Sequence, residues 1–145
     1  MYNAKHTDSL NSVKHTIITK WRTDLVRLYP GFYNEEMLIK EASIYFDFLL
    51  EMDIPVEQHA ISQRIPEMCE HFINKNIPLT HITLSNQLWI DSILHLVQED
   101  DVGKSMPIAT MRKLVWRVLE YERVFLEQYN RLCSATDTGA RSSLE

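Results

Sequence analysis

Apolar residues recur at steps of three and four along most of this chain, a spacing typical of helices that bury one face. The first such segment covers about residues 8–29, where Val13, Ile17 and Trp21 fall on one side, and a Pro-Gly pair at 30–31 is expected to end it. No stretch alternates apolar and polar residues over the length of a strand. The pattern therefore predicts an all-α fold, a bundle of about five to six helices.

A second helix is predicted from Asn34 to about Met52. Asn34 is a favourable N-cap, and Glu35 and Glu36 follow it, where acidic side chains interact well with the positive end of the helix dipole. The residues expected to be buried share one face of this helix, and they are Leu38, Ala42, Tyr45, Phe46, Leu49 and Met52.

Prolines divide the middle of the chain. Pro66 cannot donate a helical hydrogen bond, so residues 57–64 and 66–74 are predicted as two short helices, with Pro66 in the first turn of the second. Pro78 is placed to open a longer helix that reaches about Gln98. One polar residue, Asn86, interrupts the apolar face of that helix.

The last predicted helix runs from Pro107 to about Cys133, after an acidic linker at 99–103 and a possible cap at Ser105. It is apolar around much of its circumference, which is more than a single internal contact requires. Part of it is therefore expected to pack against another subunit. The segment 134–145 has no apolar period, so residues 1–133 are predicted as one domain and 134–145 as a flexible tail.

The composition fits a folded helical domain. Hydrophobic residues make up 45% and aromatic residues 10% of 145 residues, which suits one domain with a core and argues against disorder. With only three glycines, neither a phosphate-binding loop nor a dinucleotide motif is expected. A net charge of −5 gives no electrostatic basis for binding nucleic acid. The sequence shows neither a signal peptide nor a run long enough for a membrane span.

Candidate catalytic and metal-binding groups are scattered. Cys69 and Cys133 stand outside any CxxC motif and are predicted to be small buried thiols in a reducing cytoplasm. The six histidines form no HxxxH or HExxH pair, so a zinc site is not expected. His71 follows Cys69 by two residues, and side chains two apart on a helix do not face each other. We therefore predict a protein that is not an enzyme.

Four stretches carry a resemblance to a known family: Trp21–Leu25, Ile65–Met68, Ile77–Ile82 and the aromatic final helix. With the order of the helices, they resemble the non-haem globin sensor domains of bacilli, which include the amino-terminal domains of the stressosome RsbR proteins. The chain is more closely similar to the stand-alone sporulation inhibitory proteins, which resemble the sensor domain of a sporulation histidine kinase and lack its catalytic part. The resemblance covers about residues 8–133.

The resemblance implies a globin-like homodimer whose cavity takes a ligand other than haem. In the sporulation subgroup this ligand is a fatty acid, with a halide ion such as chloride nearby. The implied function is non-catalytic: a stand-alone sensor competes with a sporulation histidine kinase for its signal or its partners, and so lowers the phosphate flow into sporulation. In agreement, the sequence has no phospho-accepting histidine box followed by a Gly-rich ATP lid.

A fatty-acid chain requires a narrow apolar channel with polar groups at one end, and each buried CH₂ contributes roughly 0.8 kcal/mol. The apolar residues expected to line it are Tyr45, Phe46, Leu49, Phe72, Ile82, Trp89, Ile93, Val118 and Tyr121. The expected polar contacts are Asn86, His81 near a helix N-terminus, and a carboxylate clamp of Arg112 and Arg117. Each apolar residue fits an ordinary core equally well, and Asn86 could instead bond to a neighbouring backbone or a buried water.

Two alternatives remain open at this point. One is a ligand-free dimeric interaction module of a stress-signalling complex, with a filled core. The other is a haem sensor with His81 or His95 as the iron ligand. The competing interpretation of His81 is a first-turn residue with local hydrogen bonds, and that of His95 is a cation near a helix C-terminus.

Overall fold

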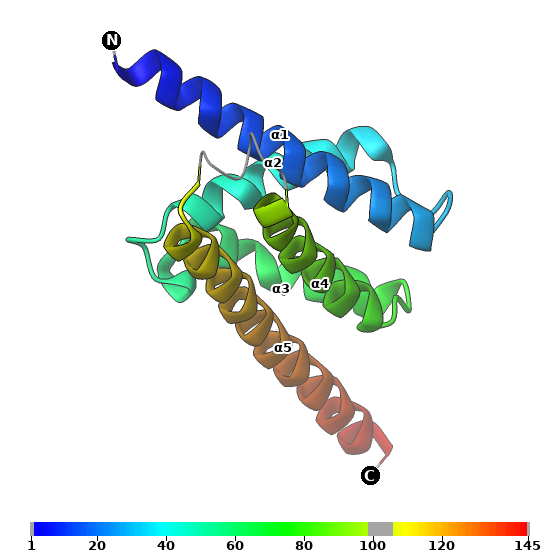
Figure 1. Ribbon diagram of the computed structural model, residues 1–145. Coiled ribbons are helices and arrows are strands. Elements are labelled where there is room, and N and C mark those ends of the chain that lie inside the picture. The colour runs from blue at the N-terminus through cyan, green and yellow to red at the C-terminus, as the bar shows by residue number, and fades with distance from the viewer. Residues whose placement is uncertain (1, 99–105, 145) are drawn as a thin grey trace.

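The computed structural model describes residues 2–98 and 106–144, and within them it is built of helices without a strand (Figure 1). This confirms the all-α fold. The five α-helices are α1 (Tyr2–Leu28), α2 (Glu35–Leu50), α3 (Ile65–Asn74), α4 (Thr80–His95) and α5 (Ile108–Leu144). The three 3₁₀ segments are η1 (Val56–Gln58), η2 (Ala60–Arg64) and η3 (Leu96–Gln98).

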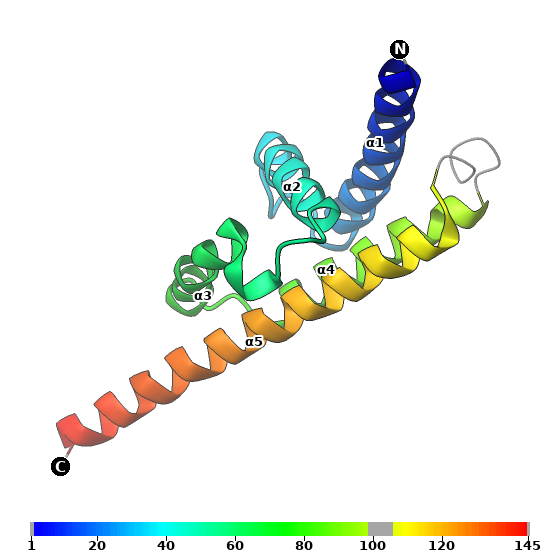
Figure 2. The ribbon, with the colours of Figure 1, turned by 90° about the vertical axis from the view of Figure 1, so that its left-hand side faces the viewer.

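Helix α4 lies between α1 and α5, and it runs antiparallel to α5 (Figure 2). Helix α2 packs against α1 and α5, and α3 packs against α5 further along that helix. The C-terminal end of α5 extends past α3, away from the other helices (Figure 2). Because every other α-helix contacts α4 or α5, these two antiparallel helices form the centre of the bundle.

The predicted apolar stripes supply the core. The most deeply buried large side chains are Phe46, Phe48, Phe125, Ile17, Leu25, Leu49, Ile65, Ile93, Leu96, Leu114, Val13 and Val118. Trp21 of α1 stacks on Trp89 of α4 at 5.0 Å between ring centroids, and its Nε1 donates to the carbonyl of Ser85 at 3.2 Å. Burying the indole with its N–H paired is the favourable arrangement for this side chain.

Several local signals are confirmed. Asn34 is the N-cap of α2, and its side chain accepts a hydrogen bond from the backbone N–H of Met37 at 3.1 Å. Pro66 lies in the first turn of α3. Gly31 follows α1 with a φ of +74°, a left-handed conformation that glycine adopts without steric cost.

Several predicted boundaries differ from the structure. The first helix, predicted from about residue 8, begins at Tyr2. Residues 57–64 form the 3₁₀ turns η1 and η2, because His59 between them has extended backbone and its Nδ1 accepts the N–H of Ile61. The helix predicted from Pro78 begins at Thr80 and ends at His95, where η3 follows. The predicted end at Cys133 is wrong, since α5 continues to Leu144. An established helix adds residues without needing an apolar stripe.

The flexibility of the segment 134–145 stays a prediction. The acidic linker at 99–103 and the cap at Ser105 lie outside the described residues.

Candidate functional sites

Aromatic rings occupy the region between α2, α4 and α5 where the ligand channel was predicted. The ring of Tyr45 lies 4.9 Å from that of Trp89 and 5.1 Å from that of Tyr121, and Phe48 lies 5.5 Å from Tyr45. All four side chains are buried. These are the distances of aromatic pairs in direct contact. The structure thus brings Tyr45, Trp89 and Tyr121 together as predicted, but they touch one another instead of facing across a channel.

Phe48 is a member of this cluster that the sequence pattern missed. The predicted stripe of α2 assumed one buried face, whereas Phe48 lies outside that stripe and is fully buried. Its ring is covered by His59, which lies between η1 and η2, and by Arg117 of α5. The run of apolar residues at the end of α2 is the signal that this helix is buried on more than one side there.

The hydroxyl of Tyr45 is buried and has no hydrogen-bond partner among the described residues. Burial raises the pKa of Tyr45 well above its usual value of 10, as do the neighbouring Tyr121 and Glu122. A hydroxyl that is buried without a partner loses its hydrogen bonds to water and gains no hydrogen bond within the protein. This atom is therefore the place in the core where a small polar group would be most readily accepted.

Asn86 has a partner that the sequence did not identify. Its Nδ2 donates to Oε2 of Glu122 on α5 at 3.0 Å, so the buried amide links α4 to α5. The predicted interpretation as an anion contact is disfavoured here, because an anionic ligand at this amide would meet the negative charge of Glu122. The partner of the amide is thus a carboxylate, and not the backbone group or water that the sequence left open.

His81 lies in an aromatic cluster at the other end of α4. Its ring stacks on Tyr29 at 3.8 Å, and its Nδ1 is 3.0 Å from the hydroxyl of Tyr33. Burial lowers the pKa of His81 below its usual 6.5, because the charged ring is disfavoured away from water. His81 therefore holds the turn between α1 and α2 against the first turn of α4, and no contact between described residues joins it to the other predicted polar residues, Asn86, Arg112 and Arg117.

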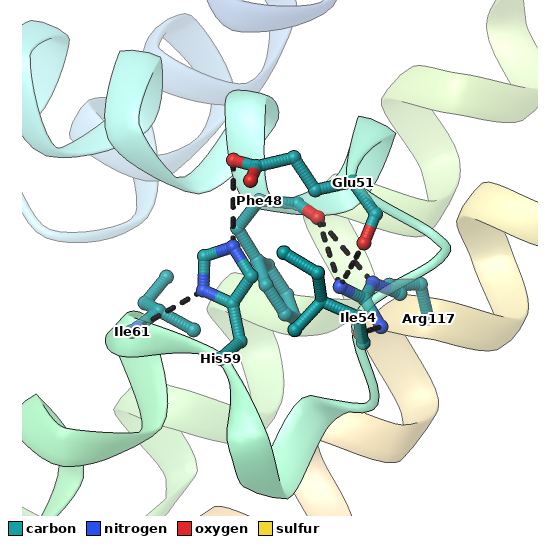
Figure 3. A network of polar contacts seen from close by, with 6 residues as sticks. All are labelled: Phe48, Glu51, Ile54, His59, Ile61 and Arg117. Atoms are coloured by element: carbon teal, nitrogen blue, oxygen red, sulfur yellow. Dashed lines mark hydrogen bonds and ion pairs between the residues drawn. The ribbon is translucent and has the colours of Figure 1, made fainter.

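Arg117 is buried, with 5% of its surface exposed, and it closes the C-terminal end of α2 (Figure 3). Its Nε and Nη2 both donate to the carbonyl of Phe48, at 3.3 and 3.2 Å. Nη2 also donates to the carbonyl of Glu51 at 2.6 Å, and Nη1 donates to the carbonyl of Ile54 at 2.6 Å. The guanidinium lies 4.4 Å from the Phe48 ring centroid. Desolvation lowers the pKa of Arg117, although Glu120 and Glu51 act in the opposite direction.

The predicted carboxylate clamp is therefore only half available. Four of the five N–H donors of Arg117 are used by backbone carbonyls, while Arg112 is exposed and has no partner among the described residues. The remaining predicted residues are Phe46, Leu49, Ile82, Ile93 and Val118 in the core and the partly buried Phe72. Whether any of them contacts a ligand stays a prediction.

The outer side of α4 and α5 carries exposed apolar side chains. Along α5, Ile108, Arg112, Val115, Leu119, Glu122 and Leu126 follow one another at steps of four, three, four, three and four, so they form one strip of four apolar and two charged residues. Ile108 is 64% and Leu119 43% exposed.

Helix α4 adds to the same side. Asn86 meets Glu122, so Ile90, one turn further along the antiparallel α4, is placed beside an earlier turn of α5. Leu94, one turn beyond Ile90, is 49% exposed. We call Ile90, Leu94, Ile108, Val115, Leu119 and Leu126 the α4–α5 face. An exposed apolar surface that continues over two helices is typical of a protein–protein contact.

No group of three or more His, Cys, Asp or Glu side chains is arranged to hold a metal ion within the described part of the chain. Cys69 is buried and Cys133 partly buried, and both are free thiols. Burial raises the pKa of the Cys69 thiol to about 11, which leaves it protonated and unreactive near neutral pH. None of the helices formed by described residues is both long enough and apolar enough to cross a membrane.

Comparisons of the chain with protein-family models, with curated proteins and with solved structures give no match.

Proposed function

We propose that this protein is a non-catalytic signalling regulator that acts as a homodimer through the α4–α5 face. The observation that carries the proposal is the set of four apolar residues in the α5 strip beside the exposed Leu94 of α4. Two antiparallel helices from each copy would form a four-helix contact, which is the usual way for such strips to be covered. A globin-like sensor module of the kind implied by the sequence resemblance is consistent with this arrangement, and a sporulation histidine kinase pathway is the first place to look for its partner.

Sedimentation velocity of the purified chain tests the dimer. We expect a dimer for the native chain and a monomer for Leu119→Glu, because the new carboxylate would be buried without a partner. Ile39→Glu is the matched control, since Ile39 is also 43% exposed but has Glu35, Glu36, Ala42 and Ser43 as its helical neighbours. Ile39→Glu should remain dimeric. A monomeric native chain at micromolar concentration, or a dimeric Leu119→Glu, would overturn the proposal.

A second candidate is the fatty-acid-responsive form of the same regulator. The observation that favours it is the buried Tyr45 hydroxyl without a partner, within the region predicted to bind the ligand. A fatty acid would have to displace the rings that now fill this region, since Tyr45, Trp89 and Tyr121 are in contact. The binding site would then be opened by its ligand.

Native mass spectrometry separates the two candidates. A dimer with added mass matching one fatty acid per subunit supports the second candidate, and Tyr45→Phe should then reduce the ligand-bound fraction. An unliganded dimer that also fails to take up added palmitate supports the interaction module alone. If no ligand uses the hydroxyl, Tyr45→Phe should raise the free energy of unfolding by about 1 kcal/mol, because an unpaired buried polar group is removed.

A further inference from the structure

A groove of about 700 Å³ lies between α5 and the turn that follows α2, outside the α4–α5 face. From the turn it is lined by Met52 and Asp53, and from α5 by Ala109, Arg112, Lys113, Trp116, Arg117 and Glu120. The strip of the α4–α5 face follows Val115 and Leu119 on the side of α5 next to α4. The groove thus lies on the neighbouring side of the same helix, and Arg112 borders both surfaces.

Trp116 is the most conspicuous residue of the groove. It is 64% exposed, whereas Trp21 and Trp89 are 5% and 3% exposed. A large exposed indole is costly to leave in water and is enriched where binding energy is concentrated in protein interfaces. Ile54, which is 37% exposed, follows the groove residue Asp53 in the sequence.

The charges of the groove favour an acidic occupant. Arg112 and Lys113 are exposed and form no ion pair with a described residue. The guanidinium of Arg117 donates to carbonyl oxygens and has no carboxylate at ion-pair distance among the described residues. One of its Nη1 hydrogens has no partner among those residues either. Asp53 and Glu120 also line the groove, so three cations stand against two carboxylates in a chain whose net charge is −5.

The shape of the groove favours a polypeptide over a small molecule. Small-molecule sites usually enclose most of their ligand, whereas this groove is open along successive turns of α5. A segment of a partner protein needs only to lie across it, with an apolar side chain on Trp116 and a carboxylate between Arg112 and Lys113.

We infer that this groove docks an acidic segment of a partner protein that carries a large apolar side chain beside its carboxylates. The inference deepens the proposed function by naming the class of partner that the regulator contacts, and it does not require the dimer. Arg117 contributes by fixing the turn after α2 to α5, so that both walls of the groove keep their positions.

The test is the selection of peptides from a random 12-residue library on phage, with the full chain as target. We expect the selected peptides to be net negative, with an aromatic or large aliphatic residue next to Asp or Glu. They should bind Arg112→Glu/Lys113→Glu at least tenfold more weakly. Lys40→Glu/Arg131→Glu is the matched control, because it reverses one lysine and one arginine that are exposed elsewhere and form no ion pair with a described residue. It should bind normally.

Trp116 provides a second readout, as it is the exposed tryptophan among three. A selected peptide should shift its emission to shorter wavelength and protect it from acrylamide, and Trp116→Phe should abolish both effects. Selected peptides that are not acidic, failure to select any, or equal binding to the double charge reversal would overturn the inference. Acetate that protects Trp116 from acrylamide as well as the peptide does, at the same concentration, would also overturn the inference. Protection of Trp116 in the free chain that is lost on dilution would overturn it too, because it would show that a second copy of the chain occupies the groove. Sedimentation of the same samples reports the dimer separately.

Discussion

Arg117, on α5, donates hydrogen bonds to backbone carbonyls at the C-terminal end of α2, which have no donor within α2 itself. The last carbonyls of a helix have no intrahelical donor, and the C-cap of α2 at Glu51 is followed by a turn without glycine. The guanidinium of Arg117 supplies donors to Phe48, Glu51 and Ile54 from another helix. A cation at this position also interacts favourably with the negative end of the α2 dipole.

Arg117→Lys should therefore lower the free energy of unfolding by about 2–4 kcal/mol, because an ammonium group cannot reach three carbonyls in the planar arrangement that arginine allows. Urea unfolding followed by circular dichroism measures this difference. The matched control is Arg112→Lys on the same helix, which is exposed and should change stability by less than about 0.5 kcal/mol. Equal stability of the two variants would show that the four hydrogen bonds of Arg117 contribute nothing.

At the scale of the element, the start of α2 depends on one side chain. Asn34 accepts the N–H of Met37, and its backbone has the extended conformation of an N-cap, with φ −77° and ψ 118°. The two glutamates after it add a favourable interaction with the helix dipole.

Asn34→Ala should cost about 1 kcal/mol of stability, since it leaves an N–H of the first turn without its acceptor. Asn34→Ser keeps a side-chain acceptor and should be close to the native chain. Thermal unfolding of the three proteins at one concentration compares them. A serine variant as unstable as the alanine variant would mean that Asn34 acts through something other than capping.

The turn between α1 and α2 is held to α4 by His81, and this contact should be sensitive to pH. The pKa of His81 is lowered in the folded chain by burial, and Tyr29, Phe32 and Tyr33 are the rings around it. The unfolded chain takes up a proton near pH 6.5, whereas the folded chain takes it up only at lower pH. Stability contributed by neutral His81 is therefore present above pH 6.5 and is lost as the pH falls through 6.5 toward the folded-state pKa.

We expect the difference in unfolding free energy between the native chain and His81→Phe to shrink or reverse as the pH falls from 7 to 5.5, with a slope of at most about 1.4 kcal/mol per pH unit. Phenylalanine keeps the stacking on Tyr29 and cannot titrate. Urea unfolding at several pH values measures the difference, and other titrating groups largely cancel in it. A difference independent of pH would show that His81 titrates alike in the folded and unfolded chains.

At the scale of the whole molecule, the dimer proposed through the α4–α5 face should link stability to concentration. Association of folded copies stabilises them by mass action, so the melting temperature of the native chain should rise with protein concentration. Leu119→Glu should melt at the same temperature at all concentrations. Differential scanning calorimetry over a hundredfold range measures this, and a melting temperature that does not depend on concentration in the native chain would contradict the dimer.

Helix type and order were predictable because they depend on local spacing. Asn34 and Pro66 mark helix starts by their own chemistry, and the apolar steps of α1 and α2 led to Val13, Ile17, Leu38 and Phe46 in the core. Helix ends were less predictable. His59 divides residues 57–64 by a hydrogen bond to the backbone of Ile61, and the sequence pattern does not show which of several polar side chains will do so.

The sequence by itself determined the fold class, the main helices and most of the core, since these follow from the period of apolar residues and from capping and proline signals within a few positions. Only the tertiary structure decided what the polar residues contact. Asn86 meets Glu122 and Arg117 meets the end of α2, each across dozens of residues of sequence, and the indole of Trp116 is left in an open groove. The physical reason is that a polar group can be satisfied by many partners, and the one it finds depends on which helices pack side by side.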